Sequence, residues 1–514
     1  MSEPLPSSVE ELAGLVIELR AANAGLREVI AVQAAALHGA DAVEMLRAQL
    51  AAQAQQLAAQ EAQLVAQAAE LAGLKQRLGK DSSTSNKPPS ADPPYRKPQR
   101  RSSRRCAGRD PGKQKGAPGS AMGLVDNPNE TIICDPDSCA DCGADLSGAP
   151  VTGTARRQVT DVRPPPPPWV TEYQIITRAC PCCAARTPGE APAGVTGRAQ
   201  YGPGVLARAA ELGCGHYLPV ARGAALMGSM LGVSVSTGFM AGVRARAARL
   251  LEKEFLPRVR ELLRNVGVLH VDETPIRADG GLEYVHAAST EFLTAMHTGG
   301  PTKDDIDAGQ VLPGYTGTIV RAGYAGYIHL IDAHHGWCGA HLLRDLAAFH
   351  LVDPDGQFWA AAMADTLTDA HHHAQAARAA GHEHLDPDVL TGIRRRYHGA
   401  TTAGISDNTT RAGPLATDAL TLARRFRNHE DMILRFVVDL AVPFTNNQNE
   451  RDVRPAKIQQ RTSGGCWRTL DGLADFAIVQ PYLSTATKWG LDSFDDLTQL
   501  FTTGAWLPPA ATPG

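Results

Sequence analysis

The feature that most constrains the fold is a succession of short apolar segments that begins near residue 266. Residues 266–273 (VGVLHVDE) have the composition of a buried strand, and residues 282–289 and 292–297 follow after short turns. Three consecutive short strands predict an antiparallel meander. A further strand is expected over residues 316–321, and it leads into a helix predicted over residues 334–350.

This order, three antiparallel strands and then strands alternating with helices, is typical of a ribonuclease-H-like core, and we expect a multidomain α+β/α/β fold class. Such cores place carboxylates around two divalent ions that assist phosphoryl transfer. Asp272 ends the first strand and fits the first carboxylate. Glu450 fits another, because it lies in the first turns of a helix that Asn446 or Asn447 can cap. Alternatively, Asp272 is a lone acid after a strand and Glu450 a lone surface glutamate.

Three basic residues, Arg451, Arg454 and Lys457, follow Glu450 on the same predicted helix. Their spacing makes Arg454 and Lys457 near neighbours on one side of that helix. Basic side chains beside a metal-binding acid suit a nucleic-acid backbone, so we expect these three residues to contact DNA.

The chain has 514 residues, enough for several domains. Its formal net charge of −4 gives no sign of nucleic-acid binding by the chain as a whole, although local charge differs. No apolar run is long enough for a membrane span. The acidic start, MSEPLPSSVEELAG, lacks the basic region of a signal peptide. We therefore expect an intracellular multidomain protein, cytoplasmic and associated with the nucleoid.

An Ala-, Leu- and Gln-rich stretch predicts a coiled coil over residues 8–79. One seam recurs every seven residues and consists of Leu15, Ala22, Val29, Ala36, Val43, Leu50, Leu57, Leu64, Leu71 and Leu78. The second seam changes side, which indicates a phase shift. We expect a homo-oligomer formed through this helix. A long helix folded back on its own chain is the alternative.

Residues 80–125 form a Pro-, Ser- and Gly-rich segment that predicts a disordered linker. Between residues 87 and 115 it carries ten Lys or Arg against two Asp. A flexible basic segment binds DNA without regard to sequence. The residues proposed for this contact are Arg100, Arg101, Arg104 and Arg105. A solvated linker or a localisation signal is the alternative.

Two cysteine pairs predict a structural zinc site in a domain over residues 126–190. The ligands proposed are Cys139, Cys142, Cys180 and Cys183, each pair at CxxC spacing. Cys134 and Cys182 are spare and could replace a ligand. Redox-active or simply buried cysteines are the alternative.

Residues 196–263 are predicted to be a helical, DNA-binding-like region. A helix to Leu231, a turn at Gly232, an N-cap at Ser234 or Ser236 and a second helix resemble a helix–turn–helix motif. The second helix carries Arg244, Arg246 and Arg249. An ordinary helical hairpin explains the pattern about as well.

At these motifs the chain resembles the large DDE transposase of the insertion-sequence-sixty-six family over nearly its full length. Besides the predicted coiled coil, the resemblance is carried by GKDSSTSNKPPS at 79–90, the CxxCGADL block at 139–146, RQVTDVRPPPPPWVTEYQ at 157–174, HVDETP at 270–275, GYAGY and CGAHLLRDL within 323–346, and TNNQNERDVRPAKIQQRTSGG at 445–465.

The resemblance implies a catalytic core over residues 264–485 with a helical insertion at about 346–440, followed by a tail over 486–514. It implies a triad of acids, Mg²⁺ or Mn²⁺ as cofactor beside structural Zn²⁺, and terminal inverted repeats as substrate. The expected reaction is DNA cleavage followed by strand transfer. Element ends and target DNA are the expected partners, and accessory proteins of the same element are left open. Asp272 and Glu450 match the first and third acids and are the expected metal ligands.

The position of the family's second acid, directly before GYAGY, is occupied by Ala322. A methyl group cannot ligate a metal. Among possible substitutes, Glu273 should face away from Asp272 because strand side chains alternate. Asp332 is expected in or near the following helix, and Asp345 lies within CGAHLLRDL. Two functions therefore compete, an active transposase and an inactive, oligomerising DNA-binding protein of transposase descent.

Cys338 and His341 are spaced like a metal-binding pair on a helix. We expect instead a buried cysteine and a hydrogen-bonded histidine.

Overall fold

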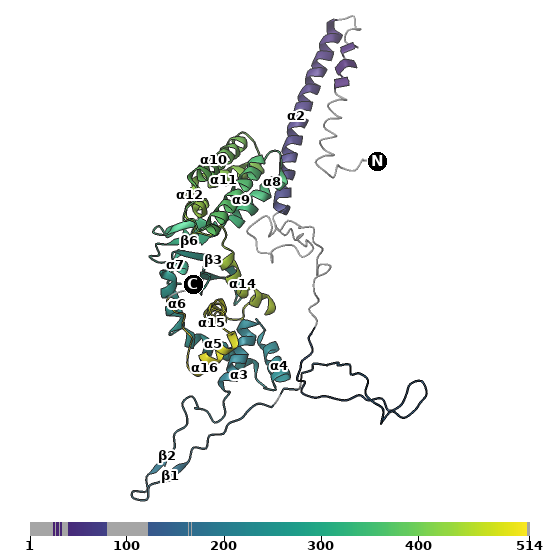
Figure 1. The fold of residues 1–514 in the computed structure, drawn as a ribbon. Coiled ribbons are helices and arrows are strands. Elements are labelled where there is room, and N and C mark those ends of the chain that lie inside the picture. Colours follow the sequence, from purple (N-terminus) through teal and green to yellow (C-terminus); the bar gives the residue numbers. More distant parts are fainter. Residues whose placement is uncertain are drawn as a thin grey trace. The chain divides into compact units, whose positions relative to one another are not determined.

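The computed structural model describes residues 24–25, 27–29, 31–32, 40–79, 122–162, 164–165 and 167–510. The chain divides into two compact units. The first comprises Met1–Pro98, Ala191–Ala225 and Val235–Gly514, and the second comprises Gln99–Glu190 and Leu226–Ser234. The first unit holds the mixed sheet and most of the helices in Figure 1. The predicted domain boundaries stay predictions.

The first unit is a mixed α/β structure built on one five-stranded sheet, whose strands lie in the order β5-β4-β3-β6-β7. The first three strands along the chain pair antiparallel, whereas β6 and β7 run parallel to β3. This confirms the meander predicted from the sequence. The bounds are β3 (Val268–Ala278), β4 (Gly281–Ser289), β5 (Thr294–Gly299), β6 (Thr318–Arg321) and β7 (His334–Trp337).

The helix predicted over residues 334–350 is wrong at its beginning. His334–Trp337 is strand β7, paired with β6, and helix α8 starts only at Gly339. The sequence His-His-Gly-Trp has no strand periodicity. It is extended because β6 supplies a backbone partner and because Arg321 Nε donates a 2.9 Å hydrogen bond to the buried His335 Nδ1. Tertiary pairing therefore overrides local preference here.

A group of helices precedes the sheet. Gly232 adopts a left-handed φ of +68°, and Ser236 Oγ accepts a 3.1 Å hydrogen bond from the Phe239 amide, so the predicted turn and cap are confirmed. The Arg244 guanidinium stacks over Trp467, and Arg246 lies over Phe501. These helices are α3 (Pro203–Ala210), a π-helical turn (Glu211–Gly215), α4 (Val220–Leu231), α5 (Thr237–Leu251) and α6 (Phe255–Arg264).

Between β7 and α14 the described chain contains helices and turns but no strand, so the helical character predicted for residues 346–440 is confirmed. One hydrophobic cluster joins Val320 and Trp337 of the sheet to Trp359, Leu367 and Phe426 of these helices. The helices are α8 (Gly339–Val352), α9 (Phe358–Ala379), α10 (Pro387–Thr409), α11 (Pro414–Asn428), α12 (Glu430–Ile433) and α13 (Arg435–Val438).

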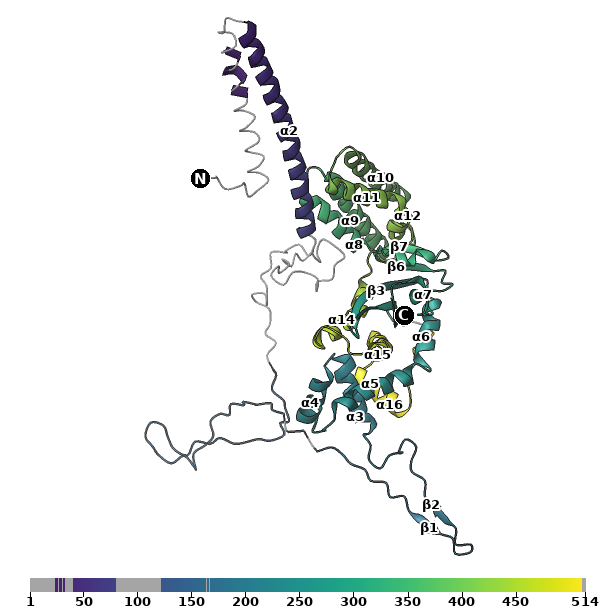
Figure 2. The same cartoon turned by 180° about the vertical axis from the view of Figure 1, so that it is seen from behind.

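Three helices follow this helical segment, α14 (Asn447–Thr462), α15 (Leu470–Lys488) and α16 (Ser493–Thr502). Helix α14 packs against β3 and β4, and α15 packs against β5. Figures 1 and 2 show α14 and α15 beside the antiparallel half of the sheet from opposite sides. The short helix α7 (Lys303–Asp307) and a 3₁₀ turn (Ala325–His329) flank β6 along the chain.

Near the N-terminus the structure shows one long helix, α2 (Ala40–Gly79), which agrees with the helix predicted there. Its pairing as a coiled coil stays a prediction. Arg100, Arg101, Arg104 and Arg105 lie outside the described residues. The second unit contains a small hairpin of β1 (Thr177–Ala179) and β2 (Arg186–Pro188). Within the described part of the chain, no helix has the length and apolar content needed to cross a bilayer.

Candidate active site

The pairing of β3 with β6 leads toward Asp272 and Ala322. His270 and Val320 are partners in this parallel pair. The printed pairing ends there, with Asp272 two residues further along β3 and Ala322 just past the end of β6 at Arg321. If the register continues, the two positions lie close together. Asp272 does not end its strand, contrary to the expectation from the sequence, because β3 continues to Ala278 in its pairing with β4. The carboxyl ends of parallel strands are where sheets of this kind present functional side chains. The position without a carboxylate thus lies at the carboxyl end of β6.

The Asp272 carboxyl occupies a poorly solvated, anionic setting. Burial raises its pKa well above its usual range, and the carboxylates of Glu273 and Glu450 raise that pKa further. A carboxyl group whose charge is disfavoured by burial and by like charges lacks a compensating cation. No positive group is among the causes that shift this pKa, so the charge of Asp272 is left without compensation by the chain.

The backbone at Ala322 is held by the preceding residue. Arg321 is 1% exposed, and its Nη1 donates hydrogen bonds of 3.1 Å to the Ala322 carbonyl and 2.8 Å to the Tyr324 carbonyl. Its Nε is committed to His335. The start of the GYAGY loop is therefore fixed by a buried guanidinium and does not depend on the side chain at position 322.

Glu273 does not substitute for the missing acid. Tyr327 donates a hydrogen bond to Glu273, and Arg321 is a close positive charge. Burial raises the pKa of Glu273 to about 7, against the opposing effects of Tyr327 and Arg321. Glu273 therefore belongs to the buried network beneath the GYAGY loop.

Asp332 and Asp345 do not replace the missing second acid either. Asp332 lies in the turn before β7, not in or near a helix as expected, and this turn is at the amino end of the parallel strands, opposite Ala322. Asp345, on α8, forms an ion pair with Arg425. Neither carboxylate is among the charges that shift the pKa of Asp272.

Two asparagines clamp the start of α14 onto the sheet. The Asn446 side chain donates a 2.8 Å hydrogen bond to the Val271 carbonyl and lies 2.9 Å from His270 Nδ1. Asn449 Nδ2 donates to the carbonyls of His270 and Ala287, at 2.7 and 3.0 Å. Asn446 is the N-cap residue of α14, but its side chain makes no cap hydrogen bond, so the expected capping role is wrong. The side chain is used for anchoring instead, and this anchoring positions Glu450.

Glu450, in the first turn of α14, lies near one residue of α8, His341, and near the N-cap residue of that helix, Cys338. Cys338 Sγ, one ring nitrogen of His341 and one Glu450 carboxylate oxygen all lie within 4.8 Å of one another. The prediction of a buried cysteine is confirmed, since Cys338 is 1% exposed. The prediction of a bonded histidine is wrong for Nδ1, which has no hydrogen-bond partner among the described residues. Burial, with the nearby Arg344, lowers the pKa of His341.

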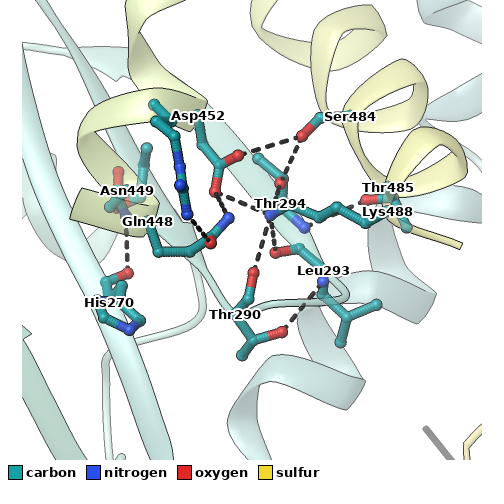
Figure 3. Close-up of polar contacts among 12 residues, drawn as sticks. His270, Thr290, Leu293, Thr294, Gln448, Asn449, Asp452, Ser484, Thr485 and Lys488 are labelled. Atoms are coloured by element: carbon teal, nitrogen blue, oxygen red, sulfur yellow. Dashed lines mark hydrogen bonds and ion pairs between the residues drawn. The ribbon is translucent and has the colours of Figure 1, made fainter. Parts of the chain in front are cut away.

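A buried ion pair fixes the next turn of α14 (Figure 3). Lys488 Nζ lies 2.8 Å from Asp452 Oδ2 and also donates to Thr294 Oγ1 and to the carbonyls of Thr290 and Leu293. Ser484 Oγ lies 3.4 Å from the other Asp452 oxygen. Helix α14, helix α15 and strand β5 are thereby tied together behind the site.

The three basic residues predicted on α14 differ in their surroundings. Arg451 and Arg454 are exposed, one turn apart, and Arg451 Nη2 contacts Gln448 Oε1 at 2.8 Å. Lys457 is half-buried and donates to the Pro275 carbonyl, and burial lowers its pKa. Arg451 and Arg454 are therefore better placed than Lys457 to meet a ligand from solvent.

Comparison with protein families identifies the lineage of this core. The profile of the transposase IS66 family matches residues 198–474, more than half of the chain. The chain belongs to the transposase IS66 family. Residues 3–122 match a family of unknown function, DUF6444. No curated protein matches the chain.

Membership of the IS66 family implies DNA as a partner and dependence on a divalent metal. The residues present fit one hard cation, because Asp272 and Glu450 offer carboxylate oxygens and Asp272 lacks a compensating charge. Ala322 offers no donor to a second ion. The Cys338–His341–Glu450 group is a separate candidate for a metal of undetermined identity.

The two CxxC pairs lie in the second unit. Among the residues that the structure describes, Cys338, His341 and Glu450 form the one group of three or more metal-binding side chains whose donor atoms lie within 4.8 Å of one another, so the four thiols of the CxxC pairs do not form such a group. Each pair forms its own turn. Backbone amides of Cys142 and Asp141 lower the pKa of Cys139, and those of Cys183 and Cys182 lower that of Cys180. Joint zinc ligation by the four thiolates stays a prediction.

Sequence reasoning missed the residues that position the acids of this IS66-family core. Asn446 and Asn449 are spaced so that both face one side of α14, and that i, i+3 spacing was a usable signal. Lys488 carried no such signal, since its partner Asp452 is identified only by the packing of α15 on the sheet.

Proposed function

We propose that this chain is a transposase-derived protein with a ribonuclease-H-like core that binds the ends of its own element, and that it lacks strand-transfer activity because its second catalytic acid is Ala322. The observation that supports this proposal is the parallel pairing of β3 and β6, whose last partners are His270 and Val320, two residues before Asp272 and Ala322. The sheet order supports the fold, since three antiparallel strands are followed by two parallel ones.

In the active form of such a site, Asp272 and Glu450 would hold the divalent cation together with an acid at position 322. When bound, the ions activate the attacking oxygen and stabilise the leaving oxygen in phosphoryl transfer. The chain's own contribution is positional. Asn446 and Asn449 fix the turn that carries Glu450, and Arg321 fixes the backbone at 322.

DNA binding is proposed to use Arg451 and Arg454 beside the site and the basic linker with Arg100, Arg101, Arg104 and Arg105. Lys457 is retained as a weaker candidate because its ammonium group is held by Pro275. Zinc bound by Cys139, Cys142, Cys180 and Cys183 would order the second unit, and a coiled coil in the N-terminal helix would join copies.

The test compares the natural chain with Ala322→Asp on DNA that contains both flanks of its coding sequence, in Mg²⁺ and in Mn²⁺. We expect end binding by both proteins and cleavage by Ala322→Asp alone, with a gain of more than about 100-fold over the natural chain, because a direct metal ligand matters at least as much as an outer one. Ala322→Asn, which is similar in size but uncharged, is the matched control and should stay inactive. Equal cleavage by the natural chain and Ala322→Asp would overturn the proposal.

A further inference from the structure

Helix α8 and helix α14 bring three different metal-binding groups to one point. Cys338 is the N-cap residue of α8 and follows β7 directly, and His341 lies one turn further along. Glu450 comes from the first turn of α14. Their donor atoms all lie within 4.8 Å of one another.

Two of these atoms are buried without a hydrogen bond. His341 Nδ1 and Glu450 Oε1 each lack a hydrogen-bond partner among the described residues, and they lie 3.6 Å apart, which is an ion pair only when His341 is protonated. Ligand atoms around one tetrahedral zinc ion are separated by about 3.3–3.6 Å, given Zn–N and Zn–O bonds of about 2.0–2.2 Å. The histidine and the glutamate therefore already have the separation of two ligands of one ion. Leaving both unsatisfied is costly, and a bound cation would remove that cost.

The thiol is also prepared as a ligand. The Asn446 amide donates to Cys338 Sγ at 3.2 Å, so the sulfur has a backbone hydrogen bond of the kind that supports metal-bound thiolates. The same residue anchors α14 to β3 through its side chain. The sulfur and the carboxylate are thus fixed relative to each other by one residue.

The chemistry of the three donors selects the class of ion. One sulfur, one imidazole nitrogen and one carboxylate oxygen suit a borderline-soft divalent ion such as Zn²⁺, whereas Mg²⁺ prefers oxygen donors alone. Asp272 and Glu450 offer oxygen only. The cluster at Cys338 therefore differs in selectivity from the pair of acids.

We propose that Cys338, His341 and Glu450 bind a zinc-class divalent ion, with Glu450 shared between this ion and the oxygen site beside Asp272. A fourth position on the ion is open to water or ligand, because the chain supplies three donors. This inference goes beyond the proposed function and does not rest on it, because binding of the ion requires neither DNA nor an acid at position 322.

The test uses the full chain carrying Cys139→Ser, Cys142→Ser, Cys180→Ser and Cys183→Ser, which removes the thiolates of the predicted zinc pairs. Co²⁺ is titrated into this protein and thiolate-to-cobalt absorption is followed. We expect a band that saturates at one equivalent and that further substitution of Cys338→Ser abolishes. Cys466→Ser, at a half-buried cysteine outside the cluster, is the matched control and should keep the band.

Two more variants keep the proposal falsifiable if Cys338→Ser perturbs folding, which circular dichroism would reveal. His341→Ala and Glu450→Gln should each weaken Co²⁺ binding by at least about 10-fold, as loss of a ligand does. Absence of the band, or a band unchanged in Cys338→Ser and His341→Ala, would overturn the proposal. Neither result would bear on cleavage by Ala322→Asp.

Discussion

Lys488 Nζ lies 2.8 Å from Asp452 Oδ2, and the two side chains are only 12% and 7% exposed. Removing one charge leaves the other buried and uncompensated. We predict that Lys488→Met lowers the free energy of unfolding by about 3–5 kcal/mol, and that adding Asp452→Asn recovers much of that loss. Denaturant unfolding measures both effects.

A matched comparison exists on the protein surface. Arg396 and Asp369 form an ion pair with side chains 44% and 50% exposed. Arg396→Met should cost no more than about 1 kcal/mol, because solvent screens an exposed pair. Similar losses for Lys488→Met and Arg396→Met would contradict the structural role assigned to the buried pair.

The second prediction concerns the anchoring of α14. Asn449→Ala removes the hydrogen bonds to the carbonyls of His270 and Ala287, both on neighbouring strands. We expect a loss of roughly 1–3 kcal/mol in the free energy of unfolding, because two backbone acceptors are left without their partner. The control is Asn428→Ala, at an exposed asparagine that ends α11, and it should change stability by less than about 0.5 kcal/mol.

The third prediction follows from the pKa of Glu273, which burial raises from 4.5 to about 7. Between these values the folded chain binds more protons than the unfolded chain, so the contribution of Glu273 to stability falls as the pH rises through this window. Glu273→Gln removes this dependence. The variant should gain up to about 3 kcal/mol relative to the natural chain above pH 7.

Thermal unfolding at a series of pH values measures this difference. Glu291→Gln, at an exposed glutamate in the turn between β4 and β5, is the matched control and should follow the natural chain at every pH. A constant offset between Glu273→Gln and the natural chain from acid to alkaline pH would show that Glu273 does not titrate in this range.

The fourth prediction tests the basic surface of α14. Arg451→Gln with Arg454→Gln should weaken DNA binding and reduce the slope of log affinity against log salt by about two, because each arginine that neutralises a phosphate contributes about one to that slope. Arg394→Gln with Arg395→Gln removes the same charge from the exposed side of α10 and should leave the slope unchanged. If both double variants reduced the slope equally, DNA binding would depend on the net charge of the protein and not on the position of these arginines.

The antiparallel half of the sheet was predictable because its signals are local. Residues 266–297 contain apolar runs separated by turn residues, and the register of a hairpin follows from such turns. Strand β7 was not predictable in this way. His334–Trp337 is extended only because β6 pairs with it and because a helical segment far along the chain covers Trp337.

The candidate site also has one part that the sequence predicts and one part that only the folded structure shows. Asp272, Ala322 and Glu450 could be placed from the sequence because each lies in a block with a recognisable pattern. The Cys338–His341 spacing was also visible, yet its third donor, Glu450, comes from a distant helix that only the folded chain brings near. Unpartnered atoms such as His341 Nδ1 are a property of packing, and no spacing in the sequence reports them.

The contacts of Arg321 have a consequence for how this lineage changes over time. The guanidinium holds the backbone carbonyl at position 322, a contact that does not involve the side chain there. Replacement of the acid at position 322 therefore leaves this contact intact, and selection for folding stability does not act against the replacement through it. A single substitution of Ala322 by Asp would restore the carboxylate on a backbone that Arg321 already holds in place.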